Sequence, residues 1–384
     1  MSQPGAPPGS VAPTDDELTA QPPRSVGHRI LSGLLSYGVV VIAVVYLLSH
    51  MNAGDSWTSA ISLITGWMLA VALILGVVNL ATNWPPIAVA LPGLRIREAA
   101  VTNTASAALS NTVPEGGAVA TGLNYAMLRS WGFSLGDITS EVLVTGTWSQ
   151  LMKYTLLAVG LVAVAIQGWG PSYVPWVALG LAVLVVVALV VLGLILHDKA
   201  FAVRLGRWAD DVVRGARHLV HRIPATTMAE GVPTFREALV SLLRICWARL
   251  TVTMLVSQLT VVLVLGVCCR MQGLDESTLS WAVILVAWGL VTFASLLVPT
   301  PGGLGVAEIV LVGVLGYGLP QSEQAAVLAA VLLYRIATFL VPIPIGLVTY
   351  LYWRKSDAWR HPVGTRGPSA ARAATSTAPD AGRG

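Results

Sequence analysis

The sequence predicts an all-α, polytopic integral membrane protein with roughly eight to ten membrane segments, including short broken or re-entrant helices. Three observations support this fold class. Hydrophobic residues make up 55% of the chain and charged residues only 11%, and the mean hydropathy is +0.73. Several apolar runs reach the length of about 20 residues that a helix needs to cross a bilayer. The chain also matches itself at one ungapped offset, which predicts an inverted internal repeat.

Charge at the ends of the apolar runs predicts the orientation. Residues 1–28 are rich in Pro, Gly, Ser and Ala and are predicted to be a disordered cytoplasmic tail. Residues 29–353 form the predicted transmembrane domain, and 354–384 a disordered basic tail. Residues 197–249 hold nine Lys and Arg against five Asp and Glu, so the basic connector 197–243 is placed in the cytoplasm with both termini. The predicted location is the plasma membrane.

In the first half, apolar runs at 30–49 and 57–80 predict two crossings. Residues 93–113 and 118–131 are only moderately apolar and suit inward-facing segments or half-helices. Between them lies a break at Pro114, Glu115, Gly116 and Gly117. Long helices are expected over 138–167 and 171–196.

In the second half, long helices are expected over 244–268, 279–298 and 322–352. A second break comprises Pro299, Pro301, Gly302, Gly303 and Gly305. Proline ends a helix by removing a backbone donor, and glycine permits turn conformations that other residues avoid. Hydrocarbon cannot satisfy the freed backbone groups, so this break must lie inside protein or beside a watery cavity. Whether 98–113, 118–131 and 303–317 cross or re-enter is left open.

A single ungapped offset relates the two halves, about 57–167 and 243–353. It pairs Gly116-Gly117 with Gly302-Gly303, Gly132 with Gly318, and Gly160-Leu161-Val162 with Gly346-Leu347-Val348. With the termini and the connector inside, and the short pieces counted as crossings, the first break faces out and the second faces in. The halves are then inverted repeats, as in many transporters.

Polar side chains within the apolar runs are the candidate substrate-binding residues. Arg335 ranks first because a guanidinium binds phosphate bidentately and stays charged when partly buried. It competes with a structural interpretation, in which Arg335 pairs with Glu308 or Glu141 and holds helices together. Glu141, Thr145, Ser149 and Lys153 recur every four residues and form a polar stripe. The full candidate set is Arg335, Glu308, Lys153, Glu141, Gln150, Asn111, Glu115 and Asn124.

No catalytic constellation is visible, so an enzyme is not expected, and neither a cofactor nor a metal site is predicted. Cys246, Cys268 and Cys269 are interpreted as packing residues.

The segment Pro301–Glu308, the following Leu332-Leu333-Tyr334-Arg335, and the upstream Pro114–Gly117 with Trp131–Ser134 resemble the lysylphosphatidylglycerol synthase transmembrane family, also called flippase-like. The resemblance covers most of 30–352. Many relatives carry a Gly-Glu and an Arg just after the first glycines, where this chain has Ala118-Val119-Ala120-Thr121. In bifunctional relatives this domain moves aminoacylated phosphatidylglycerol between leaflets after a carboxy-terminal domain has made it. Only a short tail follows the last predicted helix here, so the resemblance implies a stand-alone member without that aminoacyltransferase domain.

The predicted function is therefore a membrane lipid translocase. Its substrate would be a phosphate-bearing lipid such as an aminoacylated phosphatidylglycerol, a glycolipid or a polyprenyl-linked lipid. The main alternative is a non-transporting scaffold or accessory subunit of a cell-envelope lipid or glycan enzyme. A membrane-embedded transferase and a transporter of small solutes are further alternatives. The expected partners are the membrane lipid and a separate lipid-modifying enzyme, with no nucleic acid.

Overall fold

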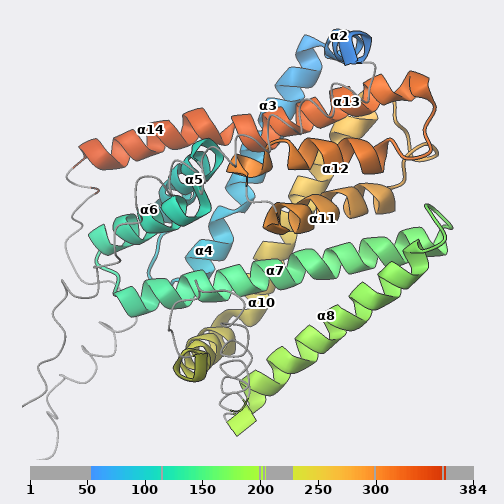
Figure 1. Cartoon of the computed structure of the whole chain (residues 1–384). Coiled ribbons are helices and arrows are strands. Elements are labelled where there is room, and N and C mark those ends of the chain that lie inside the picture. The colour runs from blue at the N-terminus through green and yellow to red at the C-terminus, as the bar shows by residue number, and fades with distance from the viewer. Residues whose placement is uncertain are drawn as a thin grey trace, which may run out of the picture.

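The computed structural model describes residues 53–113, 116–198, 200, 201, 204, 228–297, 300–356 and 359. Within these ranges the ordered elements are all helices and there is no strand (Figure 1). Five helical stretches of the described chain are long and apolar enough to cross a membrane, and they are Gly66–Ala90, Leu135–Ile166, Val174–Ile195, Cys246–Met271 and Gln321–Lys355. The predicted all-α membrane fold is confirmed. The predicted crossing over 30–49 lies outside the described residues, as do both predicted tails except 354–356 and Trp359.

The predicted crossing over 57–80 is wrong in its bounds. Helix α2 (Ala53–Leu63) ends before Ile64-Thr65, and the crossing consists of α3 (Gly66–Thr82) followed directly by α4 (Trp84–Ala90). Pro85 and Pro86 fall in the first turn of α4, where a missing backbone N–H costs nothing. The two prolines therefore divide the crossing without ending it.

The remaining helices follow the predicted segments closely, except that α10 begins at Met228, within the predicted connector 197–243, and not near residue 244. The first half continues with α5 (Ile96–Thr112), α6 (Gly116–Ser130), α7 (Leu135–Ile166) and α8 (Val174–His197). The second half contains α10 (Met228–Met271), α11 (Trp281–Leu297), the 3₁₀ turn η1 (Pro301–Gly303), α12 (Val306–Leu315), α13 (Gln321–Arg335), η2 (Ile336–Leu340) and α14 (Pro342–Lys355).

Two of these helices are too short for full crossings. Helix α12 has 10 residues and α6 has 15, which correspond to about 15 and 22 Å against about 30 Å of hydrocarbon. Each packs against the helix before it, α6 against α5 and α12 against α11. We therefore interpret α5–α6 and α11–α12 as re-entrant hairpins. Together with the predicted crossing at 30–49, the five described spans give an even number of crossings.

Helix bounds repeat at the offset found in the sequence. The shift that places Gly116 on Gly302 also takes α7, over 135–166, onto 321–352, the range of α13, η2 and α14. The same shift takes α5 onto α11. Gly132 and Gly318, which precede the two long helices, both have positive φ angles of 88° and 75°. The two halves therefore share their helix bounds and also the glycine turn that precedes each long helix.

The two halves pack reciprocally. Helix α5 of the first half lies against α14 of the second, and the counterpart α11 lies against α7. A Cβ atom on Gly346 in α14 would collide with the Thr104 carbonyl oxygen, and one on its counterpart Gly160 in α7 would lie 3.1 Å from Leu285 in α11. Figure 1 shows α7 running from left to right and α13–α14 from right to left. Exchange of equivalent contacts between antiparallel elements is the arrangement of inverted repeats.

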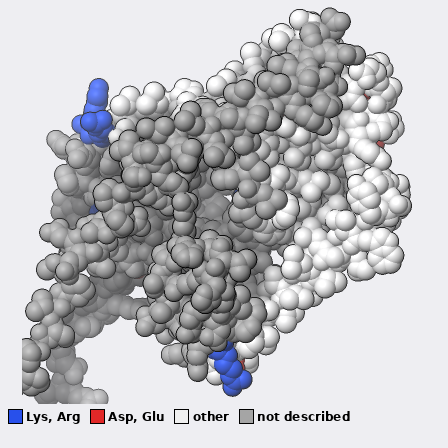
Figure 2. All heavy atoms as spheres, in the orientation of Figure 1, with Lys and Arg blue, Asp and Glu red and all other residues white. Residues whose placement is uncertain are grey.

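The two ends of the bundle differ in charge. Helices α5 and α7 start, and α6 and α14 end, at the end that carries Arg95, Arg97, Arg129, Arg354 and Lys355. In Figure 2 blue spheres lie at the outer end of α14 and beyond the lower end of α8, and the little red that is visible lies at the right. The described atoms along α8 are almost all white, as expected for a lipid-facing helix. The cytoplasmic position of the carboxy terminus stays a prediction.

Candidate functional site

The second break forms a tight turn around three glycines. Gly302, Gly303 and Gly305 have φ angles of 55°, 69° and 80°, a region that L-residues with a Cβ atom rarely adopt. Helix α12 then begins at Val306, and the Glu308 carboxylate accepts a hydrogen bond of 2.7 Å from the Gly305 amide. This is the reach-back of a capping box, in which an acidic residue in the first turn satisfies a free backbone donor. Pro299 and the side chain of Pro301 lie outside what the structure describes.

Arg335 is held by this turn. Its Nε donates to Glu308 Oε1 over 2.6 Å, and its Nη2 donates to the Gly302 carbonyl oxygen over 3.1 Å. The Phe339 ring covers the guanidinium, with its centroid 4.8 Å from Cζ. The side chains of Arg335 and Glu308 are only 13% and 17% exposed. Arg335 Nη1 makes no hydrogen bond to any described residue, so one edge of the guanidinium remains uncommitted.

A π-helical turn follows Arg335 directly. Val341 N–H donates to Ile336 O over 3.1 Å, which is the wider π spacing of η2. Pro342 and Pro344 lack backbone donors, so the carbonyl oxygens of Thr338 and Leu340 lose their α-helical partners. Between them, the Asn111 side-chain amide donates to Phe339 O, with Nδ2 at 3.0 Å. Single π turns inside helices are frequent at functional sites.

Asn111 therefore joins the two broken regions. It lies in the last turn of α5, at the tip of the first hairpin, and a Cβ on Gly302 at the second hairpin would be 3.1 Å from its Oδ1. Helix α5 also packs against η1. Arg335 lies near the middle of the 35-residue span Gln321–Lys355. Four predicted site residues, Asn111, Gly302, Glu308 and Arg335, thus come together where two hairpins meet.

Other predicted residues of the first break lie in different contacts. Asn124 Oδ1 accepts a 2.6 Å hydrogen bond from Thr102, which joins α5 to α6 within their own hairpin. Gly116 lies so close to Ser110 that a Cβ atom would collide with its carbonyl oxygen, whereas Gly117 has open space around it. Pro114 and Glu115 are outside the described residues.

The polar stripe of α7 is not brought to the Arg335–Glu308 pair by any contact found in the structure. Glu141 is only 2% exposed and is bonded to Thr145. Lys153 and Gln150 are half-buried, and neither forms an ion pair or hydrogen bond with a described residue. Helix α7 has 32 residues, so Lys153 lies about 27 Å from its start, near the middle.

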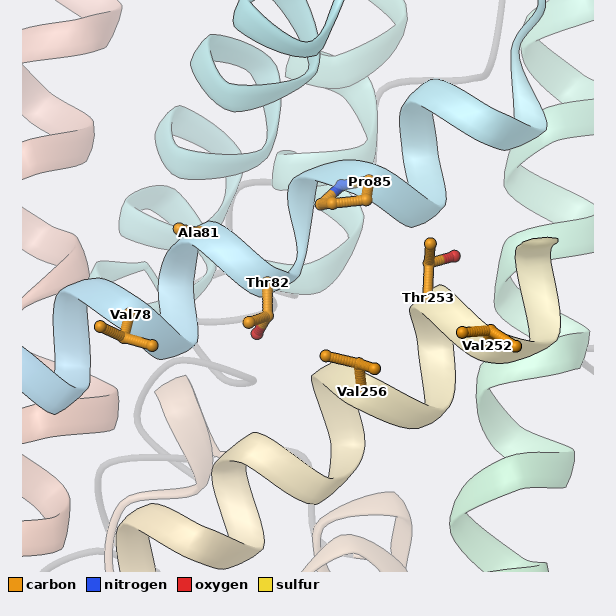
Figure 3. A pocket seen from close by; sticks show the side chains of 7 residues that line it. All are labelled: Val78, Ala81, Thr82, Pro85, Val252, Thr253 and Val256. Atoms are coloured by element: carbon orange, nitrogen blue, oxygen red, sulfur yellow. The ribbon is translucent and has the colours of Figure 1, made fainter.

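Two described grooves are apolar and lie away from the charged pair. One of about 360 Å³ opens between the α3–α4 junction and α10, as Figure 3 shows, and is lined by Val78, Ala81, Thr82, Pro85, Val252, Thr253 and Val256. Its hydroxyls are committed to backbone carbonyls, Thr82 to Asn79 and Thr253 to Arg249. The second, of about 280 Å³, lies beside Trp169 and Tyr317. Such surfaces suit acyl or prenyl chains better than a polar head group.

Residues 30–346 match the family model of the lysylphosphatidylglycerol synthase TM region. This chain belongs to that family. The match includes both hairpins and Arg335, so the meeting point of the hairpins lies within the family's own domain. A comparison with curated proteins found no match.

Membership in the lysylphosphatidylglycerol synthase transmembrane family makes this a multi-pass membrane protein of lipid-related function. Within the family domain, sequence reasoning missed Phe339 and the π turn that frees its carbonyl. The closely spaced Pro342 and Pro344 were the available signal, because two missing donors in one helix must disturb its bonding.

Proposed function

We propose that this family member moves a phosphate-bearing lipid between the two leaflets of the plasma membrane. The observation that carries the proposal is the position of Arg335: a mostly buried guanidinium near the middle of a spanning helix, where two hairpins from opposite halves meet. Transporters built from inverted repeats bind their substrates at such broken helices near the midplane. Charged groups at this depth are costly and usually functional.

The lipid phosphate would bind at the uncommitted edge of Arg335. Glu308 holds Nε, and Nη1 makes no hydrogen bond to a described residue, so a phosphate oxygen can be added without breaking the existing pair. The pair itself is neutral, and an arriving phosphate therefore needs a further positive charge. Lys153 would supply that charge, since it lies near the middle of α7 without an acidic partner among the described residues.

The acyl or prenyl chains would stay in lipid and in the apolar grooves while the head group crosses. Reciprocal contacts of α5 with α14 and of α7 with α11 would form the surface along which one half moves against the other. Gly160 and Gly346 let these helices approach closely. In the described conformation the charged pair is nearly enclosed, which fits a closed state of the cycle.

The direct test is lipid movement in proteoliposomes containing the full chain. Fluorescent phosphatidylglycerol and a polyprenyl phosphate probe are placed in both leaflets, and a membrane-impermeant quencher reports which molecules exchange. We expect the protein to accelerate exchange of at least one phosphate-bearing lipid over protein-free vesicles. Absence of movement for every probe would reject translocation and favour the accessory-subunit alternative.

A further inference from the structure

Glu141 is a buried carboxyl group that forms no ion pair with a described residue. It lies in the second turn of α7 and is 2% exposed, between Ile138 and Val144, which are fully buried. Its Oε2 atom is buried and has no hydrogen-bond partner among the described residues. The site proposed for the lipid phosphate does not use this side chain.

The hydrogen bonds of Thr145 give the carboxyl group little compensation for its burial. Thr145 Oγ1 donates to the Glu141 backbone oxygen over 2.8 Å and to Glu141 Oε1 over 3.2 Å. A hydroxyl has one hydrogen to donate, so Oε1 receives only a shared hydrogen bond. Burial of a carboxylate with so little compensation is costly, which favours the neutral carboxylic acid in this position.

The charged groups around Glu141 do not change this conclusion. Helices α4, α6, α8, α10 and α11 pack against α7, and α4 and α11 carry no charged residue. Arg129 of α6 and Arg249 of α10 are exposed, and His197 ends α8. On α7 itself, Asp137 lies one turn earlier and is hydrogen-bonded by Ser134, and Lys153 lies three turns later. The other charged residues of α10 are Glu230, Arg236, Glu237, Arg244 and Arg270. Among the side chains that the structure describes, none of these groups forms a hydrogen bond or ion pair with Glu141.

We propose that Glu141 is a proton-binding site of the transport cycle, occupied in the closed conformation, so that lipid movement is coupled to proton movement. This inference rests on the proposed function. Glu141 lies about 9 Å along α7 from its start, which is at the basic end of the bundle. A small separation of α7 from its neighbours at that end would expose the Glu141 carboxyl group to water. A buried carboxyl that charges only when exposed binds and releases a proton once in each cycle.

Infrared difference spectroscopy of the full chain in lipid at neutral pH tests proton binding without requiring transport. We expect a carbonyl stretch of a protonated carboxylic acid in the wild type that is absent from Glu141→Gln and unchanged in Asp137→Asn. Thr145→Val removes the hydrogen bond that Thr145 donates to Oε1 and should shift the band to a higher frequency. A wild-type spectrum without this band, or a band that survives in Glu141→Gln, overturns the proposal whether or not the protein moves lipid.

Coupling is then tested in proteoliposomes with an imposed pH difference and a clamped membrane potential. One proton per lipid predicts that the steady-state distribution of fluorescent phosphatidylglycerol between leaflets changes by about tenfold per unit of pH difference. Glu141→Gln should keep gradient-independent exchange and lose this response, while Asp137→Asn keeps it. A wild-type protein that exchanges lipid but ignores the gradient overturns the coupling alone. One that exchanges no lipid rejects the proposed function.

Discussion

Glu308 and Arg335 form an ion pair in which Glu308 Oε1 lies 2.6 Å from Arg335 Nε. The other carboxylate oxygen caps helix α12 through the Gly305 amide. One side chain therefore stabilises the start of a broken helix and positions the guanidinium that the next helix supplies. The sequence offered pairing with Glu308 as the structural alternative to phosphate binding by Arg335. This pair is present, and Arg335 Nη1 makes no hydrogen bond to a described residue.

Breaking this pair from one side should destabilise the protein. Arg335→Ala leaves the Glu308 carboxylate in a mostly buried position without its partner, and loss of one member of a buried pair typically costs about 3–5 kcal/mol. The comparison is Glu276→Ala, which breaks the pair between Glu276 and Arg270, whose side chains are 62% and 25% exposed, and for which we expect at most about 1 kcal/mol. Unfolding in detergent, followed by heat or denaturant, measures both. Equal costs would contradict the central role of the Arg335 pair.

Close packing between the halves predicts an uneven response to added methyl groups. Gly346→Ala places a Cβ against the Thr104 backbone oxygen, which cannot move aside easily, and should cost about 1–3 kcal/mol. Gly160→Ala meets only the Leu285 and Val286 side chains at 3.1 Å and should cost less. Gly180 in α8 has no neighbour within 4 Å, so Gly180→Ala is the control and should be neutral or slightly stabilising. Thermal unfolding of the three variants checks the order.

The hairpin interpretation predicts how deep the chain lies in the membrane. Thr112 is exposed at the tip of α5, and a spin label at Thr112→Cys should report a depth near the bilayer centre. Labels at Arg129→Cys and Ser322→Cys should react with impermeant reagents from opposite sides of the membrane. The native cysteines at 246, 268 and 269 are buried and can remain. Reaction of Thr112→Cys with an impermeant reagent from the side opposite Arg129 would mean that α5 and α6 cross fully.

Lys153 should affect transport without affecting stability. Because Lys153 has no acidic partner among the described residues, Lys153→Met removes an isolated charge and should not lower the unfolding temperature. Exchange of phosphatidylglycerol should fall at least about tenfold, as expected for loss of a charged contact to phosphate. Lys153→Arg keeps the charge and should retain most of the exchange. Unchanged exchange in Lys153→Met would remove Lys153 from the head-group site.

Much of this fold follows from the sequence, because hydropathy fixes long helices and the Gly-Gly pairs mark both breaks. The contacts between the two breaks cannot be predicted from the sequence. The repeat offset shows which positions of the two halves are equivalent, but not which residues are in contact. Asn111, for example, bonds Phe339 of the other half. The α2–α3 break was missed because Ile64 and Thr65 interrupt an apolar run without Pro or Gly before Gly66. The π turn was missed because its cause, two prolines, lies after the turn.

The most direct test of the central claim removes both charges of the pair at once. Arg335→Met with Glu308→Gln leaves no buried charge unpaired, keeps an oxygen that can accept from the Gly305 amide, and should fold nearly as well as the wild type. If Arg335 binds the lipid phosphate, this double variant loses exchange of phosphate-bearing lipids in proteoliposomes while its unfolding temperature stays close to that of the wild type. If the pair only holds α12 and α13 together, the folded double variant exchanges lipid at the wild-type rate, and that result would contradict the account.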